Sequence, residues 1–175
     1  ESAAALGGLD VSIHSAGVAT TGAFHSGSAE DWRWVFDINV LGLANCCRAV
    51  LPHMTRGQGG LIVNVASAAS FCTNAKMSSY NAAKAAVVAL SETLMQEYAA
   101  YGVQTLVAMP GFFRTRLLES ARGPERTLEG ARRSMQQSGL EADEVAEAML
   151  SAAARGRTHF VYPSRYARLW RLKRL

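Results

Sequence analysis

The 175-residue sequence has few of the residues that hold small disulfide-bonded or zinc-bound domains together. It contains three cysteines, none of them in a Cys-x-x-Cys pair or at a metal-binding spacing from a histidine. Cys46 and Cys47 are adjacent, and Cys72 stands apart. This usage favours a reducing compartment in which the cysteines are small apolar core residues. We therefore expect a cytoplasmic protein without disulfides and without a bound metal.

Long hydrophobic runs and a large charge excess are also missing. No uninterrupted apolar run reaches the roughly 18 residues of a membrane span, and no basic-then-apolar leader opens the sequence. The net charge is −2 over residues 1–100 and +6 over residues 101–175, a small excess for a nucleic-acid-binding protein. With 49% hydrophobic residues, the chain is expected to form one globular domain without a membrane span or a nucleic-acid partner.

Short apolar runs alternate with longer helical patterns along the chain. This alternation predicts βαβ units and a parallel sheet, and near-continuous apolar strands indicate that helices cover both faces. The predicted fold class is therefore α/β, a parallel sheet of about four strands with flanking helices. Ligands of such sheets bind beyond the carboxyl ends of the strands. The expected strands are 11–16, 60–67, 103–109 and 158–163, and the expected helices are 29–54, 79–102, 126–137, 141–155 and 164–175.

The segment SSYNAAKAAV (78–87) places Tyr80 and Lys84 four positions apart, on one face of the expected helix. A free tyrosine has a pKa of about 10, and a nearby ammonium group favours the phenolate. Such a tyrosine could exchange a proton with a carbonyl or an alcohol, and the hydroxyl of Ser67, at the tip of the preceding strand, could hold the same oxygen. Taken alone, a Tyr-x-x-x-Lys pattern is a weak motif.

Several further features, in the right order, make the sequence resemble the short-chain dehydrogenase/reductase family from about residue 6 to residue 165. Ser67 stands thirteen positions before Tyr80, which is the family spacing. Asn39 lies in FDINVLG, where the family has a helical asparagine. HSAG (14–17) occupies the place of the family's Asn-Asn-Ala-Gly turn, and PGFFRT (110–115) matches its Pro-Gly followed by threonine.

The resemblance implies a Rossmann-like fold and an oxidoreductase that passes hydride between NAD or NADP and a small carbonyl or alcohol. Among the residues implied to be catalytic, Tyr80 is the acid/base and Lys84 lowers its pKa and binds the nicotinamide ribose. Ser67 orients the substrate carbonyl, and Asn39 helps to hold a water that leads from Lys84 to solvent. The implied cofactor-binding residues are Ala16, Gly17, Tyr80, Lys84, Pro110, Gly111, Phe113 and Thr115.

The family also implies what surrounds this site. The stretch 112–140 covers the substrate, and Phe112, Phe113, Leu117 and Leu118 suit either an apolar carbonyl or alcohol or, equally, the protein core. Homo-oligomers are implied through two long helices, here about 30–54 and 79–101. The basic segment 164–175 is expected to be a final helix packed on the domain, with a membrane-surface or partner helix as the alternative.

Two departures from the family pattern matter. His14 and Ser15 replace the two asparagines, and His14 is expected to be a buried, hydrogen-bonded core residue rather than a catalytic one. The chain also contains no Gly-x-x-x-Gly-x-Gly turn, which holds the cofactor pyrophosphate at a helix N-terminus. Residues 1–175 are therefore expected to be a single, N-terminally truncated NAD(P)-binding domain that lacks its first βαβαβ unit. One edge of strand 11–16 should then be bare.

Two other classes of function were compared with this one. A serine hydrolase would need a Gly-x-Ser-x-Gly elbow, but the sequence around Ser67 is VASAAS. A non-catalytic fragment or binding module of the same fold remains the alternative, because a chain without the Gly-rich turn should bind the cofactor weakly.

Overall fold

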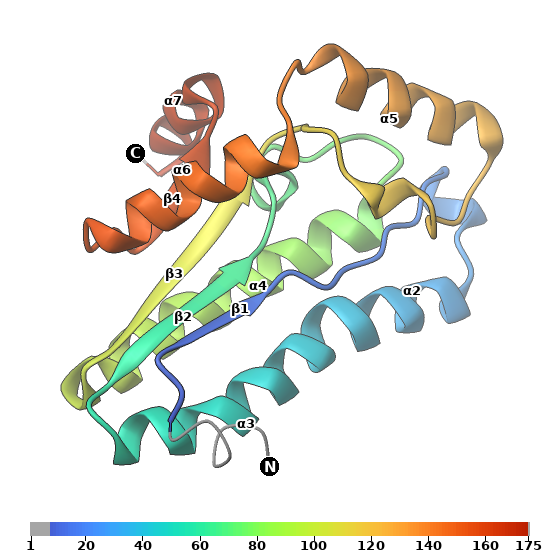
Figure 1. The fold of residues 1–175 in the computed structure, drawn as a ribbon. Helices are drawn as coiled ribbons and strands as arrows, with labels where there is room; N and C mark the ends of the chain where they lie inside the picture. Colours follow the sequence, from blue (N-terminus) through green and yellow to red (C-terminus); the bar gives the residue numbers. More distant parts are fainter. Residues whose placement is uncertain (1–7, 175) are drawn as a thin grey trace.

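The computed structural model describes residues 8–174 and contains a four-stranded sheet flanked by helices (Figure 1). The strands run in the order β1-β2-β3-β4, and every pair of neighbours is parallel. This confirms the predicted α/β class and the predicted number of strands. The strands are β1 (Val11–His14), β2 (Gly60–Val65), β3 (Val103–Pro110) and β4 (His159–Tyr162).

The helices begin and end close to the predicted positions. The expected helix 29–54 is one continuous helical stretch made of three labelled segments, and the expected helix 79–102 ends in a short 3-10 turn, η4 (Ala99–Tyr101). Gly102 follows with a left-handed φ of 70°, which turns the chain into β3. The helical segments are α2 (Ala29–Phe36), η2 (Asp37–Gly42), α3 (Leu43–Arg56), α4 (Ser78–Tyr98), α5 (Glu125–Gln137), α6 (Ala142–Ala154) and α7 (Ser164–Lys173).

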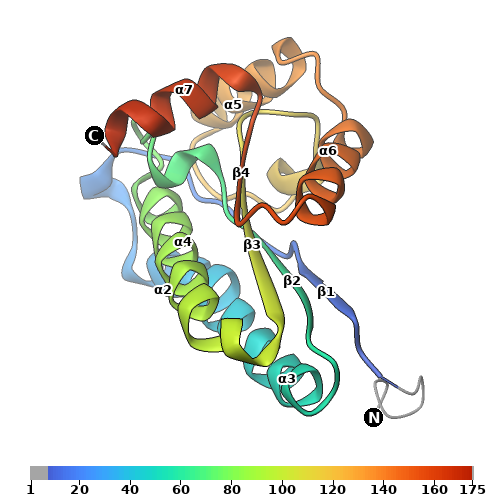
Figure 2. The same cartoon turned by 90° about the vertical axis from the view of Figure 1, so that its left-hand side faces the viewer.

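Helices cover the two faces of the sheet unequally. On one face α3 and α4 pack on β2 and β3, in a cluster that includes Leu51, Met54 and Val87. On the other face α6 packs on β2, β3 and β4, where Val145 and Met149 contact the strands. Figure 2 shows these helices on opposite sides of the sheet. Successive side chains of β3 point to opposite faces and therefore contribute to two separate hydrophobic cores.

Strand β1 forms one edge of this sheet. Among the described residues it pairs only with β2, and its side chains Val11 and Ile13 remain 48% and 45% exposed. By contrast, the central residues Leu106 and Val107 of β3 are fully buried. This confirms the expectation of a bare apolar edge at the first strand.

The stretch Ala29–Arg56 has the length and composition of a helix that could cross a membrane. This stretch contains no uninterrupted apolar run of about 18 residues, and it meets the criterion through its mean hydropathy. In the structure, however, one face of this stretch carries the buried side chains of Val35, Leu43 and Cys47, and α3 packs on the sheet. Core helices of water-soluble proteins satisfy the same length and composition criteria, so this stretch is weak support for a membrane span.

Candidate active site

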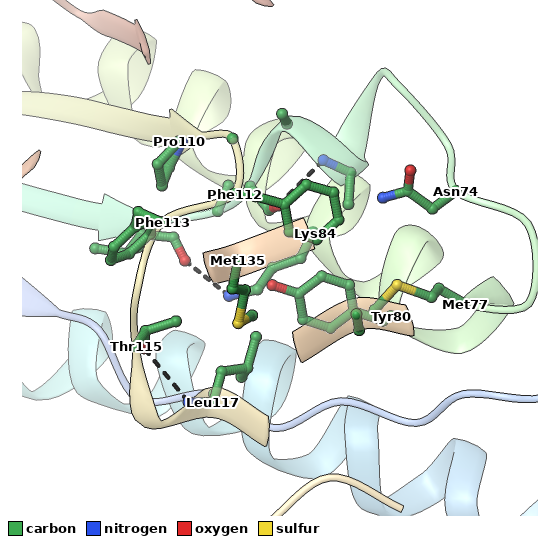
Figure 3. A pocket seen from close by; sticks show the side chains of 18 of the residues that line it. Asn74, Met77, Tyr80, Lys84, Pro110, Phe112, Phe113, Thr115, Leu117 and Met135 are labelled. Carbon is green, nitrogen blue, oxygen red and sulfur yellow. Dashed lines mark hydrogen bonds between the residues drawn. The ribbon is translucent and has the colours of Figure 1, made fainter. Parts of the chain in front are cut away.

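The carboxyl ends of β1, β2 and β3 surround a cavity of about 110 Å³ (Figure 3). Its walls come from the segments after each of these strands, from the start of α4, and from α5 and α7. Parallel strands bring their carboxyl ends to the same edge of the sheet, so residues distant in sequence meet there. The cavity therefore lies where the sequence predicted a ligand site.

Tyr80 and Lys84 point into this cavity from the first turns of α4 (Figure 3). Both are buried, with 7% and 4% of their surface exposed. The Lys84 Nζ atom donates a 2.8 Å hydrogen bond to the carbonyl oxygen of Val65, at the end of β2, and lies 5.7 Å from the centre of the Tyr80 ring. A single hydrogen bond thus ties the lysine to the strand tip and leaves its other protons free for the cavity.

Burial sets the protonation of this pair. It raises the pKa of Tyr80 to about 12, although a hydrogen bond with the Ser67 hydroxyl lowers it in part. Burial also lowers the pKa of Lys84 to about 8, because the charged amine loses hydration. Burial therefore sets the direction of the Tyr80 shift, and the expected lowering of its pKa by Lys84 stays a prediction. The Tyr80 hydroxyl is protonated at neutral pH.

Ser67 stands immediately after β2 and begins the short 3-10 turn η3 (Ala68–Ser70). Its Oγ atom accepts a 3.1 Å hydrogen bond from the backbone N–H of Ala69, which fixes the side chain at the cavity wall. The hydroxyl proton remains available to interact with Tyr80 or with a bound oxygen. The structure therefore brings together the serine, tyrosine and lysine that the sequence singled out.

Asn39 lies in the π-helical segment η2 and is almost fully buried. Its Oδ1 atom accepts from the backbone N–H of Val18, and its Nδ2 atom donates to the carbonyl of the same residue, each at 2.8 Å. The side chain therefore pins the segment that follows β1. An added Cβ atom on Gly17 would lie 3.1 Å from Asn39 Oδ1 and 3.4 Å from Lys84 Nζ, so Gly17 passes closely between the two.

Most of the predicted cofactor-side residues line the cavity. They are Gly17, Pro110, Gly111, Phe113 and Thr115, together with Tyr80 and Lys84. Ala16 differs, because it is exposed and does not belong to the cavity wall. Ser15, one position earlier, lines the cavity in its place.

Sequence reasoning missed several wall residues. Asn74 and Met77 come from the segment that joins η3 to α4, Met135 from α5 and Tyr166 from α7. Asn81, which follows Tyr80, donates a 2.8 Å hydrogen bond to the carbonyl of Asn74 and so holds this segment. No motif marks Asn74, Met77 or Tyr166, and only the fold brings α7 to the cavity; Met135 lies within the stretch 112–140 that the resemblance implied to cover the substrate.

His14 is hydrogen-bonded, as expected, but it is half-buried rather than buried. Its ring nitrogens lie 2.8 Å from Ser12 Oγ and 2.9 Å from Asn64 Oδ1. Asn64 in turn donates to Ser91 Oγ on α4, so the histidine belongs to a polar network between β1, β2 and α4. Over residues 8–174, no group of three or more His, Cys, Asp or Glu side chains forms a metal site.

The parallel sheet, with Ser67, Tyr80 and Lys84 together at its carboxyl edge, has the arrangement of the doubly wound, nucleotide-binding α/β folds. The family model described as short chain dehydrogenase matches residues 1–126. The chain belongs to this family.

Individual relatives agree with this assignment. The chain is 33% identical over 112 residues to a 3-oxoacyl-[acyl-carrier-protein] reductase of Synechocystis sp., covering 64% of this chain and 45% of that protein. It is 35% identical over 153 residues to a cis-4-hydroxycyclohexanecarboxylate dehydrogenase of Sinomonas cyclohexanicum, covering 87% of this chain and 61% of that protein. The chain thus spans about half the length of the curated relatives it matches.

A solved structure extends the likeness beyond the matched motifs. A short-chain dehydrogenase/reductase from Burkholderia phymatum, in complex with NAD, superposes with a TM-score of 0.87 at 29% sequence identity. The alignment covers 95% of this chain and 66% of that one. The likeness therefore extends well past residue 126, where the match to the family model ends.

Proposed function

We propose that this chain is the C-terminal part of an NAD(P)-dependent oxidoreductase that interconverts a carbonyl and an alcohol. The observation that carries the proposal is the meeting of Ser67, Tyr80 and Lys84 in one cavity at the carboxyl edge of the sheet. The nucleotide supplies the hydride when it is bound. We assign the Gly-rich turn and the first strands of the domain to sequence outside these 175 residues.

In this proposal Tyr80 transfers the proton. A pKa raised to about 12 keeps its hydroxyl protonated at neutral pH, so it can donate to the carbonyl oxygen during reduction. Ser67 donates a hydrogen bond to the same oxygen and holds it beside the tyrosine. In the oxidative direction Tyr80 accepts the alcohol proton, a step that a neighbouring positive charge favours because it stabilises the phenolate.

Lys84 and Asn39 position these groups. Lys84 is anchored to the carbonyl of Val65 and keeps its remaining protons for a ribose hydroxyl or a water molecule. Asn39 holds the segment after β1 through Val18, and we infer that it supports a water next to Lys84. The absence of a side chain at Gly17 preserves this arrangement, because a Cβ atom there would crowd Asn39 and the Lys84 amine.

The remaining cofactor contacts come from the segments after β1 and β3. We propose Gly17, Pro110, Gly111, Phe113 and Thr115 as wall residues beside the nicotinamide. Ala16 keeps only a backbone role, since it lies outside the cavity wall. The residues present fit the nicotinamide end of NAD or NADP. The buried amine of Lys84 and the backbone of Gly17 and Gly111, which carries no side chain, line the same cavity.

We propose an apolar carbonyl or alcohol as substrate. The cavity wall opposite the sheet carries Leu117, Met77 and Met135. Two arginines near its mouth are already paired, Arg114 with Glu141 at 2.6 Å and Arg116 with Glu119 at 2.9 Å. Apolar walls favour a substrate whose carbon skeleton leaves water on binding.

Substitution of Tyr80 by phenylalanine in the full-length enzyme tests the function. The ring remains and only the acid/base hydroxyl is lost, so kcat should fall by about 10²- to 10⁴-fold. Tyr101→Phe is the matched control, because Tyr101 is an exposed tyrosine on η4 and should leave kcat unchanged. Circular dichroism checks that both variants fold. Near-full activity of the Tyr80→Phe variant would contradict the proposed mechanism.

A second candidate is a non-catalytic fragment of the same fold. The bare edge of β1 favours it for the 175-residue chain on its own, because a cofactor site beside β1 needs more strands. The homo-oligomer that the family resemblance implies stays a proposal; the 56% exposed Leu41 on η2 lies on the long helix that would form its interface.

A further inference from the structure

The C-terminal helix α7 contributes one side chain to the cavity, Tyr166. A Cβ atom added to Gly111 would overlap the ring of Tyr166. Gly111 is not among the residues with a left-handed φ, so its backbone conformation does not require glycine. The ring itself is what excludes a side chain at position 111. The tyrosine ring and the glycine backbone therefore form one continuous wall.

Two hydrogen bonds near the end of α7 fix the helix to the rest of the protein. Lys173 Nζ donates a 2.7 Å hydrogen bond to the carbonyl of Phe71, in the segment that also lines the cavity through Cys72. Arg174 Nη2 donates a 2.7 Å hydrogen bond to Glu92 Oε1 on α4. These contacts join the C-terminal end of α7 to α4 and to the segment after η3.

Glu92 strengthens the attachment because it also meets β4. Its Oε1 atom lies 2.9 Å from His159 Nε2. Trp170 of α7 packs between these groups, with its ring 5.2 Å from that of His159 and 4.8 Å from the Arg174 guanidinium. Burial raises the pKa of Glu92, but the hydrogen bonds from His159 and Arg174 outweigh it and the pKa is lowered. Glu92 is therefore ionised at neutral pH.

The same cavity is also lined by methionine side chains. Methionine side chains, such as Met77 and Met135, adapt to differently shaped ligands. An aromatic ring that packs against backbone atoms adapts much less to the shape of a ligand. The size of an admitted substrate should therefore depend more on the ring of Tyr166 than on the methionines.

We propose that Tyr166 is a specificity-determining residue of the proposed oxidoreductase, whose ring limits the size of the substrate that the cavity admits. The proposal rests on the proposed function. It concerns the ring rather than the hydroxyl, because the contact with Gly111 involves ring carbon atoms.

The test compares two neutral ketones, cyclohexanone and 4-phenylcyclohexanone, as substrates of the full-length enzyme. Removal of the ring in Tyr166→Ala should raise the kcat/KM ratio of the larger to the smaller ketone by about 10-fold or more. Tyr166→Phe keeps the ring and should keep the wild-type ratio. Tyr101→Ala removes an exposed tyrosine ring and should also keep it. A ratio in Tyr166→Ala within twofold of wild type would overturn the proposal.

Two further measurements cover other outcomes. If Tyr166→Ala does not fold, Tyr166→Leu keeps an apolar side chain there and should still raise the ratio; an unchanged ratio in that variant counts against the proposal. If the wild-type enzyme reduces neither ketone, the proposed function fails. A binding measurement then tests whether the Tyr166 ring limits the size of the ligand. In that case 4-phenylcyclohexanone should raise the Tm of the alanine variant more than that of wild type, and equal shifts would refute the wall.

Discussion

The interior strand β3 and the edge strand β1 differ sharply in how well they are covered. Strand β3 lies between α4 and α6, and Leu106 and Val107 within it are fully buried. Strand β1 has one neighbour among the described residues, and Val11 and Ile13 are nearly half exposed. Ser67, Tyr80 and Lys84 are held by β2 and α4 in the covered part, whereas Gly17, one of the residues proposed to face the nucleotide, follows the open strand. The three side chains of the proposed proton-transfer group thus meet within the part of the sheet that the structure describes.

Truncation of an apolar side chain should show the largest difference in stability between β3 and β1. Leu106→Ala should lower the free energy of unfolding of the 175-residue chain by about 2–5 kcal/mol, because it leaves a cavity between two packed faces. Ile13→Ala should cost less than about 1 kcal/mol in the same chain, because the side chain is already half exposed. Urea denaturation of both variants measures the difference. Equal losses would contradict the unequal packing.

The Ile13→Ala substitution should also be measured in the full-length enzyme, to compare the burial of β1 there with its exposure in the 175-residue chain. If further strands cover β1 there, Ile13→Ala should cost about 2–5 kcal/mol, as for any buried isoleucine. A loss that stays below about 1 kcal/mol would mean that β1 is an open edge in the full-length enzyme as well.

Loss of the Asn39 side chain should have an intermediate effect. Asn39→Ala leaves the buried N–H and C=O groups of Val18 without partners, at a cost of about 1–3 kcal/mol. Asn74→Ala is the comparison variant, because its hydrogen bond from Asn81 uses only the backbone carbonyl. Thermal unfolding should show a clear drop for the first variant and little change for the second. Equal behaviour would mean that Asn39 does not hold the segment after β1.

The smallest expected effect is a pH dependence from Lys84. Burial lowers its folded-state pKa to about 8, below the value of 10.5 in an unfolded chain. Above pH 8 the folded chain loses the Lys84 proton while the unfolded chain keeps it. The free energy of unfolding should therefore increase from pH 7 to pH 9. Lys84→Met should remove this increase. Denaturation curves of both proteins at the two pH values test it, and identical slopes would show that Lys84 does not carry the shift.

Much of the fold was predictable because its signals are local. The strands have apolar runs bounded by turn residues, and the predicted element ends lie close to the observed ones. Ser67, Tyr80 and Lys84 could be selected because parallel strands bring their carboxyl ends to one edge. Tyr166 could not, since its contact with Gly111 depends on how α7 returns over the sheet. The direction of the Tyr80 pKa shift also depends on burial, which a spacing does not reveal.

The central claim is that the chain contains the proton-transfer group but lacks the strands and the Gly-rich turn that complete the cofactor site. A fluorescence titration of NADH and NADPH against the 175-residue chain and the full-length enzyme tests it directly. The account predicts micromolar binding of one nucleotide by the full-length enzyme and a Kd at least about 100-fold weaker for the chain, a difference of about 2.7 kcal/mol. Micromolar binding by the 175-residue chain itself would contradict it.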